Sequence, residues 1–222
     1  MYFAIKEENE TREPSNKGKR LPPEPLTREE VETLLRGCSK RCPTGLRNRA
    51  LIVMLWRGQL RAGEALALLP KDLDRERGTV RVLHGKGDKS RVVGLDPGSW
   101  EILERWIDER KQLGFNGSHR LFCTLRGKPI FNSYLRKLLP RLALKTGIQT
   151  IGEDGKRYGK RVHPHGLRHS GAFDLANEGH PIHVISAQLG HSSTAVTDRY
   201  ISHLAPQAVI ETMQGREWRE PE

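Results

Sequence analysis

The first helical signal in the chain comes from Val31, Leu34 and Leu35, apolar residues spaced so that they share one face of a helix. The segment Thr27–Glu30 precedes them. Its two end residues carry the sequence signature of a capping box, in which a threonine hydroxyl and a glutamate carboxylate each accept a hydrogen bond from the other residue's backbone N–H. The pattern predicts a helix that begins just after Thr27, and we expect the folded domain to start there.

Two more helices follow from the next apolar positions. Apolar residues recur at helical steps from Gly45 to Arg57, and Gly58 then interrupts the pattern. A short helix is predicted from Arg61 to Leu69. It ends at Pro70, because proline cannot donate the next helical hydrogen bond.

The periodicity changes to two between Gly78 and Leu95. Val80 and Val82 alternate with Thr79 and Arg81, residues 85–88 read Gly-Lys-Gly-Asp, and apolar residues return at 92–93. Alternation on both sides of a glycine-rich turn is typical of a β-hairpin. We therefore predict one antiparallel hairpin here.

The rest of the chain is predicted to be mainly helical. Asp96 and Pro97 have the residue types favoured at an N-cap and at the first helical position, and the helix that they start ends at Gly114. A short extended stretch is expected at Leu121–Pro129. Further helical segments are expected at 132–146, 165–178, 181–188, 194–201 and 205–214, with one long loop at 152–161. The predicted fold class is α+β, mainly helical, with a small antiparallel sheet.

The division of the chain follows from composition. At 222 residues it is long enough for one domain with extensions. Residues 1–26 contain five basic and five acidic residues, four prolines and almost no apolar periodicity, so we expect a flexible arm. The folded domain is predicted to span 27–214, and 215–222 to form a tail.

The balance of charge points to a polyanionic partner. Lys and Arg number 38 against 27 Asp and Glu, giving a net charge of +11, and the balanced arm leaves this excess on the folded part. Basic residues that meet phosphates release condensed counterions, so nucleic acid is the favoured partner. The longest apolar run, Ala50–Trp56, is too short to cross a bilayer, and no signal peptide is apparent at the N-terminus. We expect a cytoplasmic protein without a membrane partner.

Neither the cysteines nor the histidines predict a metal site. The three cysteines have no second Cys or His pair at zinc-finger spacing, and we interpret them as reduced thiols. A zinc site at His163, His165 and His169 has suitable ligand types. However, the chain has no His-Glu-x-x-His motif, and no carboxylate or thiolate lies at ligand spacing. We predict no cofactor and no metal, and keep a zinc hydrolase as an alternative hypothesis.

Several short motifs fit one pattern when they are taken in order along the chain. They are Leu60–Glu64, the turn residues 85–89, residues 163–169 (His-Pro-His-Gly-Leu-Arg-His), Leu189–His191 and Thr197–Tyr200. Together they resemble the tyrosine recombinase, or phage integrase, family, from about Thr27 to Met213. The residues that match the family's catalytic set are Arg61, Lys86, His165, Arg168, His191 and Tyr200.

The resemblance implies the catalytic-domain fold of that family and DNA cleavage at specific sites. Tyr200 would attack a phosphodiester and form a covalent 3′-phosphotyrosyl intermediate, releasing a 5′-hydroxyl. Because this ester stores the energy for rejoining, the reaction needs no ATP. Two guanidinium groups, Arg61 and Arg168, and the donor of His191 suit the charge that develops on the non-bridging oxygens without a metal.

The remaining roles concern protons and support. The phenol of Tyr200 must lose a proton, and His165 is the predicted general base or positioning group. By resemblance Lys86 is the general acid for the leaving 5′-oxygen, with Lys89 as the competing assignment. Glu64 matches an acidic position of the family and is expected either to orient Arg61 or the hairpin, or to form a simple i,i+3 surface pair. The predicted supporting residues are His169 and His203.

The expected partner is double-stranded DNA. Most relatives carry an additional N-terminal helical domain, and this chain has only its 26-residue arm at that place. The segment Pro206–Met213 is amphipathic. By resemblance it would pack on a neighbouring copy in a dimer or tetramer on DNA, and packing on its own domain, in a free monomer, is the alternative. A basic DNA-binding regulator with the same fold and idle chemistry is the alternative function.

Overall fold

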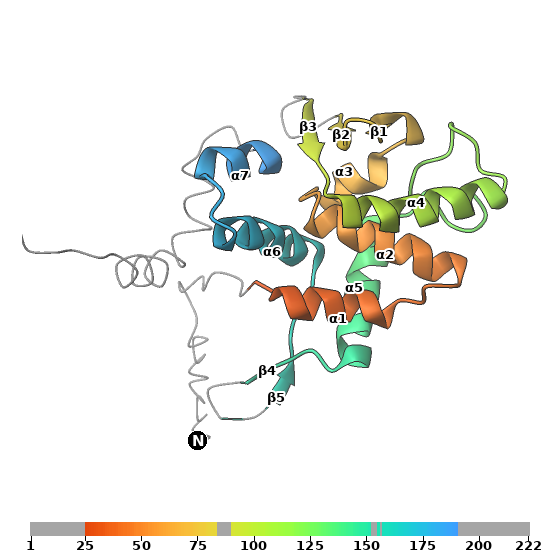
Figure 1. Cartoon of the computed structure of the whole chain (residues 1–222). Helices are drawn as coiled ribbons and strands as arrows, with labels where there is room; N and C mark the ends of the chain where they lie inside the picture. Colours follow the sequence, from red (N-terminus) through yellow and green to blue (C-terminus); the bar gives the residue numbers. More distant parts are fainter. Residues whose placement is uncertain (1–24, 84–89, 152–154, 156, 191–222) are drawn as a thin grey trace, which may run out of the picture.

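The computed structural model describes residues 25–83, 90–151, 155 and 157–190. This part of the chain is mainly helical, with two small antiparallel sheets (Figure 1). The helical elements are α1 (Arg28–Gly37), α2 (Pro43–Trp56), α3 (Ala62–Ala67), the 3₁₀ turn η1 (Pro70–Asp72), α4 (Pro97–Gln112), α5 (Asn132–Thr146), α6 (Pro164–Asn177) and α7 (Ile182–Leu189). The strands are β1 (Leu73–Asp74), β2 (Thr79–Val82), β3 (Arg91–Gly94), β4 (Gln149–Ile151) and β5 (Arg157–Gly159).

Helix α2 is the centre of the core. Nearly every residue of α2 from Gly45 onward is buried, because α3, α4 and α6 all pack against it. Pro43 lies in the first turn of this helix. Cys42 is the N-cap, and its sulfur accepts a hydrogen bond from the N–H of Gly45 at 3.3 Å. Proline is tolerated at this position because the first N–H groups of a helix have no acceptor within the helix. The helix therefore begins two residues before the predicted start.

Two predicted helix starts are confirmed in atomic detail. The Thr27 hydroxyl accepts from the N–H of Glu30 at 3.3 Å, and the Glu30 carboxylate accepts from the N–H of Thr27 at 2.9 Å. At the start of α4, Asp96 accepts from the N–H of Ser99 at 3.0 Å. Leu26, immediately before α1, is itself buried, and its N–H donates to the hydroxyl of Ser170. The packed part of the molecule thus includes the residue before Thr27.

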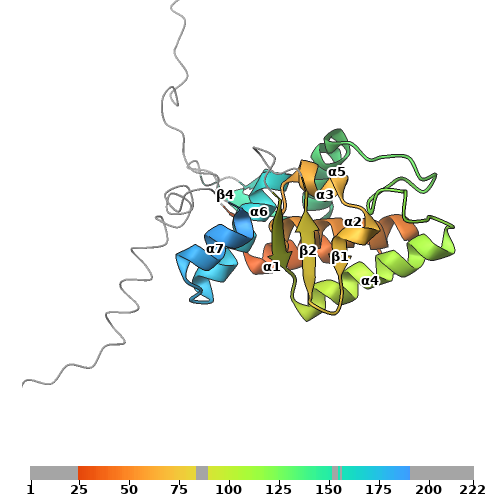
Figure 2. The same cartoon turned by 90° about the horizontal axis from the view of Figure 1, so that it is seen from above.

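The predicted hairpin forms, and a third strand joins it. Strands β2 and β3 pair antiparallel with Val80 opposite Val93, and β1 pairs with the other edge of β2. Val80, Val82 and Val93 are buried, as their alternation predicted. Viewed from above, this sheet lies across the helical layer, next to α3 and α4 (Figure 2). It brings β3 close to the C-terminal helices, where it contacts α7.

Two sequence expectations need correction. The segment 152–161 is not a loop throughout, because Arg157–Gly159 is the strand β5, which pairs with β4 in a second, two-stranded sheet. The stretch Leu121–Pro129 is not extended throughout, because it folds back on itself in a tight turn. The N–H of Gly127, which has a φ of 74°, bonds to Thr124, and a single bridge joins Cys123 to Pro129.

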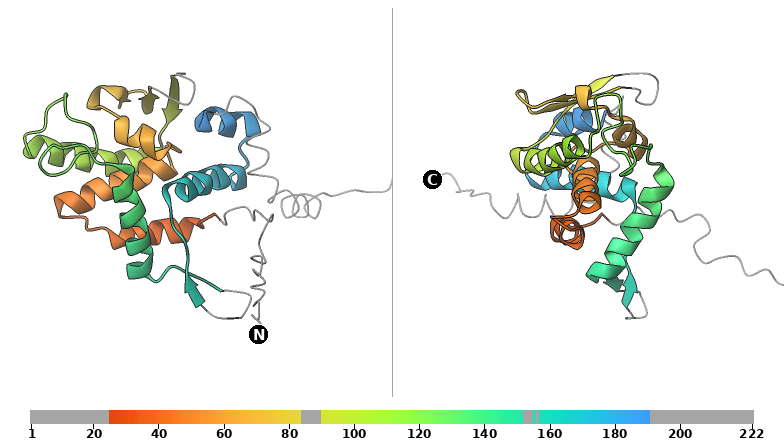
Figure 3. Two further views of the ribbon diagram at one scale, coloured as in Figure 1. Left: turned by 180° about the vertical axis from the view of Figure 1, so that it is seen from behind. Right: turned by 90° about the vertical axis from the view of Figure 1, so that its right-hand side faces the viewer.

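Helices α5, α6 and α7 agree with the predicted segments to within one residue at each end. Helix α5 runs along one side of the core, and the β4–β5 hairpin extends from its end (Figure 3). The predicted helices at 194–201 and 205–214 lie outside the described residues. None of the described helices is both long enough and apolar enough to cross a membrane.

Helix α6 approaches the core helix α2 at a glycine. A Cβ atom built on Gly171 would lie 1.9 Å from the carbonyl oxygen of Trp56, a distance that no side chain can accept. The same two helices are joined by the indole N–H of Trp56, which donates to the buried carboxylate of Asp174 at 2.8 Å. Gly171 is therefore required for the position of α6.

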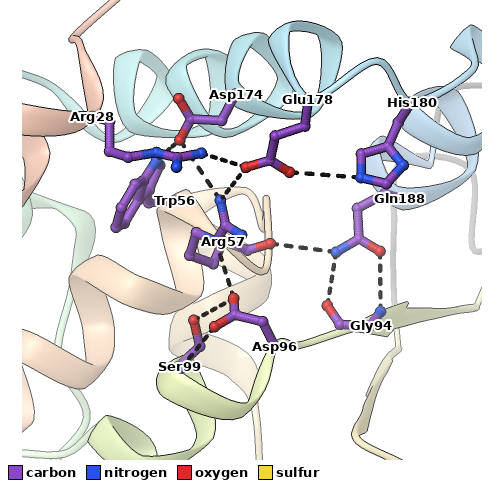
Figure 4. Close-up of polar contacts among 10 residues, drawn as sticks. All are labelled: Arg28, Trp56, Arg57, Gly94, Asp96, Ser99, Asp174, Glu178, His180 and Gln188. Atoms are coloured by element: carbon purple, nitrogen blue, oxygen red, sulfur yellow. Dashed lines mark hydrogen bonds and ion pairs between the residues drawn. The ribbon is translucent and has the colours of Figure 1, made fainter.

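A network of charged residues fixes α6 against α1, α2 and α4 (Figure 4). Arg57, at the end of α2, has its Nε 3.0 Å from a carboxylate oxygen of Asp96, and its Nη1 lies 3.8 Å from Asp174 and 3.5 Å from Glu178. Arg28 of α1 also pairs with Glu178. One guanidinium group thus links the start of α4 to acidic residues at the end of α6.

Gln188 attaches α7 to the free edge of the sheet (Figure 4). Its amide nitrogen donates to the carbonyl oxygen of Gly94 at 2.9 Å, and its amide oxygen accepts from the N–H of Gly94 at 3.0 Å. The side chain thus bonds to both the backbone N–H and the C=O of Gly94, as the backbone of a further strand would. The end of α7 is therefore held against β3.

Candidate active site

A hollow of about 510 Å³ lies where the loop before α3 meets the starts of α5 and α6. Its lining includes three arginines and two histidines among apolar residues. The lining residues are Leu60, Arg61, Ala62, Gly63, Asn132, Arg136, His163, Pro164, His165 and Arg168. Three of the predicted catalytic residues, Arg61, His165 and Arg168, thus meet in one hollow although they come from segments far apart in the sequence.

Arg61 is held by Glu64 at the start of α3. The backbone N–H of Arg61 donates to Glu64 Oε2 at 2.8 Å, and its guanidinium Nη1 donates to Oε1 at 2.8 Å. The Arg61 side chain is 36% exposed, whereas that of Glu64 is only 5% exposed. Glu64 is therefore not half of a simple surface pair, which was one of the two expectations for it.

A second arginine binds the same carboxylate. Arg91 of β3 donates from both Nη atoms to the two oxygens of Glu64, at 2.9 and 2.8 Å. Burial alone would raise the pKa of Glu64, but the hydrogen bonds from Arg91 and from the N–H and side chain of Arg61 outweigh it and lower the pKa to about 2. Glu64 is thus ionised throughout the physiological range.

Arg168 is buried and tied to the backbone. Its Nη1 donates to the carbonyl oxygen of Gln59 at 2.6 Å, and its Nη2 donates to that of Leu189 at 2.5 Å. Nη1 also lies 3.9 Å from Glu64 Oε2. These contacts fix the guanidinium plane between the end of α2 and the end of α7.

The position of the Gln59 carbonyl group depends on an unusual backbone conformation. Gln59 has a φ of 52°, and it is the one non-glycine residue with positive φ in the described part of the chain. A left-handed conformation costs a non-glycine residue about 1 kcal/mol or more, so the surrounding packing must hold it. The buried Gln59 thereby supplies one of the two carbonyl oxygens that hold Arg168.

The three histidines of α6 lie close together. His163 is the N-cap, and its Nδ1 accepts from the N–H of Gly166 at 3.0 Å. The ring of His165 stands edge-on to that of His169, with centroids 4.0 Å apart. Partial burial, followed by the positive charges of Arg168, His163 and Arg61, lowers the pKa of His165. A neutral His165 has a lone pair that can accept a proton at neutral pH.

The structure brings some of the predicted site residues together, and the others lie outside the residues that it describes. Arg61, Glu64, His165, Arg168 and His169 lie at or beside the hollow. The predicted residues outside the described part of the chain are Lys86, His191, Tyr200 and His203, together with the competing Lys89. The catalytic roles of the residues in both sets remain predictions.

Sequence reasoning missed Arg91, although a signal was present. Arg91 and Val93 alternate with exposed Val92, so Arg91 is on the same, inward face as buried Val93. A charged residue on the buried face of a strand needs a partner, and an acidic residue was available at Glu64. Asn132 and Arg136, one turn apart on α5, also line the hollow and had no signal beyond the helical pattern.

The described residues define what the hollow can do chemically. It presents two guanidinium groups of fixed orientation and an imidazole with a lowered pKa. Such donors bind a tetrahedral anion and stabilise charge that develops on its oxygens. Among the described residues, no three His, Cys, Asp or Glu side chains form a group that could hold a metal ion.

Comparison with known proteins identifies relatives over most of the chain. The pattern of the phage integrase family matches residues 24–207. The tyrosine recombinase XerD of Xanthomonas axonopodis pv. citri is 32% identical over 186 residues, which cover 80% of this chain and 58% of the relative. XerC of Lactobacillus leichmannii is 31% identical over 194 residues, covering 86% of this chain and 62% of the relative. The chain thus spans about three fifths of the length of these curated relatives.

Solved structures show the same fold. XerA recombinase superposes with a TM-score of 0.72 at 28% identity, covering 88% of this chain and 66% of that one. XerH site-specific recombinase in a post-cleavage complex with its difH substrate gives 0.67 at 32% identity, covering 87% and 53%. The predicted mainly helical fold with a small antiparallel sheet is confirmed. Because the family pattern matches most of the chain and the curated relatives above share more than 30% identity, the chain belongs to the phage integrase family, which includes the Xer tyrosine recombinases that it resembles.

Proposed function

We propose that this chain is a site-specific DNA recombinase that cleaves and rejoins duplex DNA through a covalent 3′-phosphotyrosyl intermediate. The observation that carries the proposal is the convergence of Arg61 and Arg168 on one carboxylate beside one hollow. The two residues are far apart in the sequence. A purely structural arrangement would not require both guanidinium groups to line the same hollow as His165.

The proposed reaction begins with the scissile phosphate in the hollow. Arg61 and Arg168 bind its non-bridging oxygens, and their attraction increases as the pentavalent transition state gains charge. His191 adds a further donor. Each such donor is worth about 2.7–4 kcal/mol in comparable sites. These donors supply the charge stabilisation from the protein alone, without a metal ion.

The protons and bonds balance within the proposed site. Tyr200 attacks phosphorus as the phenolate, His165 accepts or positions its proton, and Lys86 gives a proton to the leaving 5′-oxygen. One phosphodiester bond is exchanged for a phosphotyrosine ester. The reverse attack by a 5′-hydroxyl restores the DNA and the free tyrosine, so no ATP is consumed.

The proposed partner is double-stranded DNA, bound chiefly through its phosphates. The net charge of +11 supports this partner, as do the exposed Arg136 and Lys137 on α5. We expect the logarithm of the binding constant to fall with the logarithm of salt concentration at about 0.9 per phosphate contact. We also propose that copies of the chain assemble as a dimer or tetramer on DNA.

A suicide substrate tests the proposal directly. Duplexes that contain candidate sites from the DNA flanking the native gene, each nicked near the cleavage position, are incubated with the protein. Attack by Tyr200 would release a short fragment and leave the protein bonded to DNA, visible as a slower band on a denaturing gel. Tyr200→Phe should form no adduct, and Tyr158→Phe serves as the matched tyrosine control.

The other outcomes separate the alternatives. DNA binding by the wild type without any adduct would contradict the recombinase proposal and favour the idle regulator. Activity that strong chelators abolish and that survives in Tyr200→Phe would favour the zinc hydrolase instead. Adduct formation in the presence of chelator, lost in Tyr200→Phe, supports the recombinase.

A further inference from the structure

We propose that Arg91 is a positioning residue that sets both site guanidinium groups, acting on Arg61 through Glu64 and on Arg168 through the end of α7. This inference rests on the proposed function for its catalytic meaning. Its geometric part concerns only residues that the structure describes, and it can be tested without DNA cleavage.

The first contact of Arg91 is with Glu64. Its two Nη atoms bind the two carboxylate oxygens at 2.9 and 2.8 Å, a fork-to-fork pair that fixes the plane of the carboxylate. The same two oxygens accept the N–H and the guanidinium of Arg61, at 2.8 Å each. The direction of the Arg61 side chain is therefore set by a carboxylate whose own orientation Arg91 determines.

The second contact of Arg91 is with Gly190, the residue that ends α7. A Cβ atom built on Gly190 would lie 2.4 Å from Cδ and 2.6 Å from Nε of Arg91, so the arginine stem lies directly against the glycine backbone. The preceding residue, Leu189, provides the carbonyl oxygen that holds Arg168 Nη2. Arg91 thus supports the backbone on which the second guanidinium is anchored.

The surroundings of Arg91 favour a role in positioning particular groups over a general electrostatic effect. Its side chain is only 13% exposed, whereas that of Arg81 on the neighbouring strand is 54% exposed and lies 3.6 Å from Asp72. Both arginines belong to the same sheet, and each pairs with a buried carboxylate that lies outside it. Of these two arginines, only Arg91 contacts the residues that position Arg61 and Arg168, so Arg81 serves as its control.

The test compares single-turnover cleavage of the suicide substrate with DNA affinity in four proteins. We expect Arg91→Gln to lower the cleavage rate about 100-fold while the dissociation constant changes less than about threefold. Arg91→Lys should recover part of the rate, because one ammonium can hold one of the two oxygens. Arg81→Gln should cleave within about threefold of wild type.

Two glycine substitutions test the contact with α7 without changing any charge. Gly190 and Gly179 both have left-handed backbones, with φ of 65° and 81°, so alanine strains both in the same way. Only at Gly190 would the new methyl group meet Arg91, since no atom of the described residues lies within 4 Å of a Cβ at Gly179. We expect Gly190→Ala to lower cleavage well below the level of Gly179→Ala at equal folded fraction.

A readout that does not need cleavage distinguishes the two proposals. In wild type the carboxyl carbon of Glu64 should titrate near pH 2, and the Nη resonances of Arg61 should show hindered rotation. In folded Arg91→Gln, we expect the Glu64 titration to move to higher pH and Arg61 to rotate faster. If wild type forms no adduct, the proposed function fails and these resonances alone decide the inference.

The inference is overturned by either of two results. One is a cleavage rate for Arg91→Gln equal to that of Arg81→Gln, after correction for folded fraction by urea denaturation. The other is an unchanged Glu64 titration and unchanged Arg61 resonances in folded Arg91→Gln. A double variant, Glu64→Gln with Arg91→Gln, should lose less activity than the two single losses multiplied together, because the two changes share the contact between Arg91 and Glu64.

Discussion

Arg168 Nη2 donates to the carbonyl oxygen of Leu189, which joins α6 to the last residue of α7 through the very guanidinium that lines the hollow. The same side chain holds the carbonyl of Gln59 through Nη1. Because Arg168 is a buried structural link and also the proposed ligand of the scissile phosphate, its substitution should affect both stability and cleavage.

Arg168→Lys separates these two roles. Lysine keeps the charge but cannot donate to both carbonyls in the fixed directions of a guanidinium. We expect the free energy of unfolding to fall by about 1–3 kcal/mol, because a buried carbonyl loses its partner. In the remaining folded protein, cleavage should fall about 100- to 1,000-fold, with a smaller loss of DNA affinity. Equal losses in binding and cleavage would argue against a role in the transition state.

Glu64→Gln tests the acid dependence of stability. Because the pKa of Glu64 is lowered from 4.5 to about 2 in the folded protein, its stabilising contribution is complete above pH 4.5 and is lost as the pH falls toward 2. The glutamine variant should be less stable by about 1–3 kcal/mol at pH 7. Its free energy of unfolding should also depend less on pH between these limits. Urea denaturation at several pH values provides the measurement.

The pKa of His165 should lie below 6.5, as its partial burial and the charges of Arg168, His163 and Arg61 require. Cleavage should therefore rise with pH through a midpoint below 6.5 and stay high at neutral pH. NMR titration of the His165 ring gives the pKa directly. The folded state binds this proton less readily than the unfolded state, so the same group makes the protein less stable as the pH falls below 6.5. A midpoint above 6.5 would contradict the described surroundings.

Gly171→Ala should destabilise the protein by about 3 kcal/mol or more, because the added methyl group meets the carbonyl of Trp56 and must push α6 away from α2. Gly117→Ala is the control, since a Cβ there lies more than 4 Å from every atom in the part of the chain that the structure describes. Thermal unfolding monitored by circular dichroism compares the two. Equal melting temperatures would show that α6 does not approach α2 as closely as described.

Gln188→Glu tests the connection between α7 and the sheet. The substitution has nearly the same shape, but it replaces the amide N–H₂ that donates to Gly94 with an oxygen. Two oxygens would then face each other, and we expect a loss of about 1–2 kcal/mol in stability. Hydrogen exchange should show faster opening of α7. Gln149→Glu, at an exposed position, should leave both quantities nearly unchanged.

Local signals explain which elements could be predicted from the sequence. The capping box at Thr27, the N-cap at Asp96 and the valine alternation at 80 and 82 each depend on a few neighbouring residues, and each was found where expected. Strands β4 and β5 were missed because three residues are too few for a period of two to stand out.

The arrangement of the site needed information that no local pattern contains. A His-x-x-Arg motif on a helix is usually a solvated pair, yet Arg168 is almost completely buried. Its burial depends on the left-handed turn at Gln59 and on the end of α7, which are distant in the sequence. The order of the predicted residues along the chain indicated the family. Strand alternation could place Arg91 on the buried face of β3, but only the folded structure shows that its partner is Glu64.

Three guanidinium groups, those of Arg61, Arg91 and Arg168, surround the single carboxylate of Glu64, so the cluster carries three positive charges against one negative. In the proposed reaction, a pentavalent phosphorus with two charged oxygens would be attracted to these guanidinium groups. Simple oxyanions such as sulfate carry similar charge, so they should raise the melting temperature, and more at low ionic strength than at high.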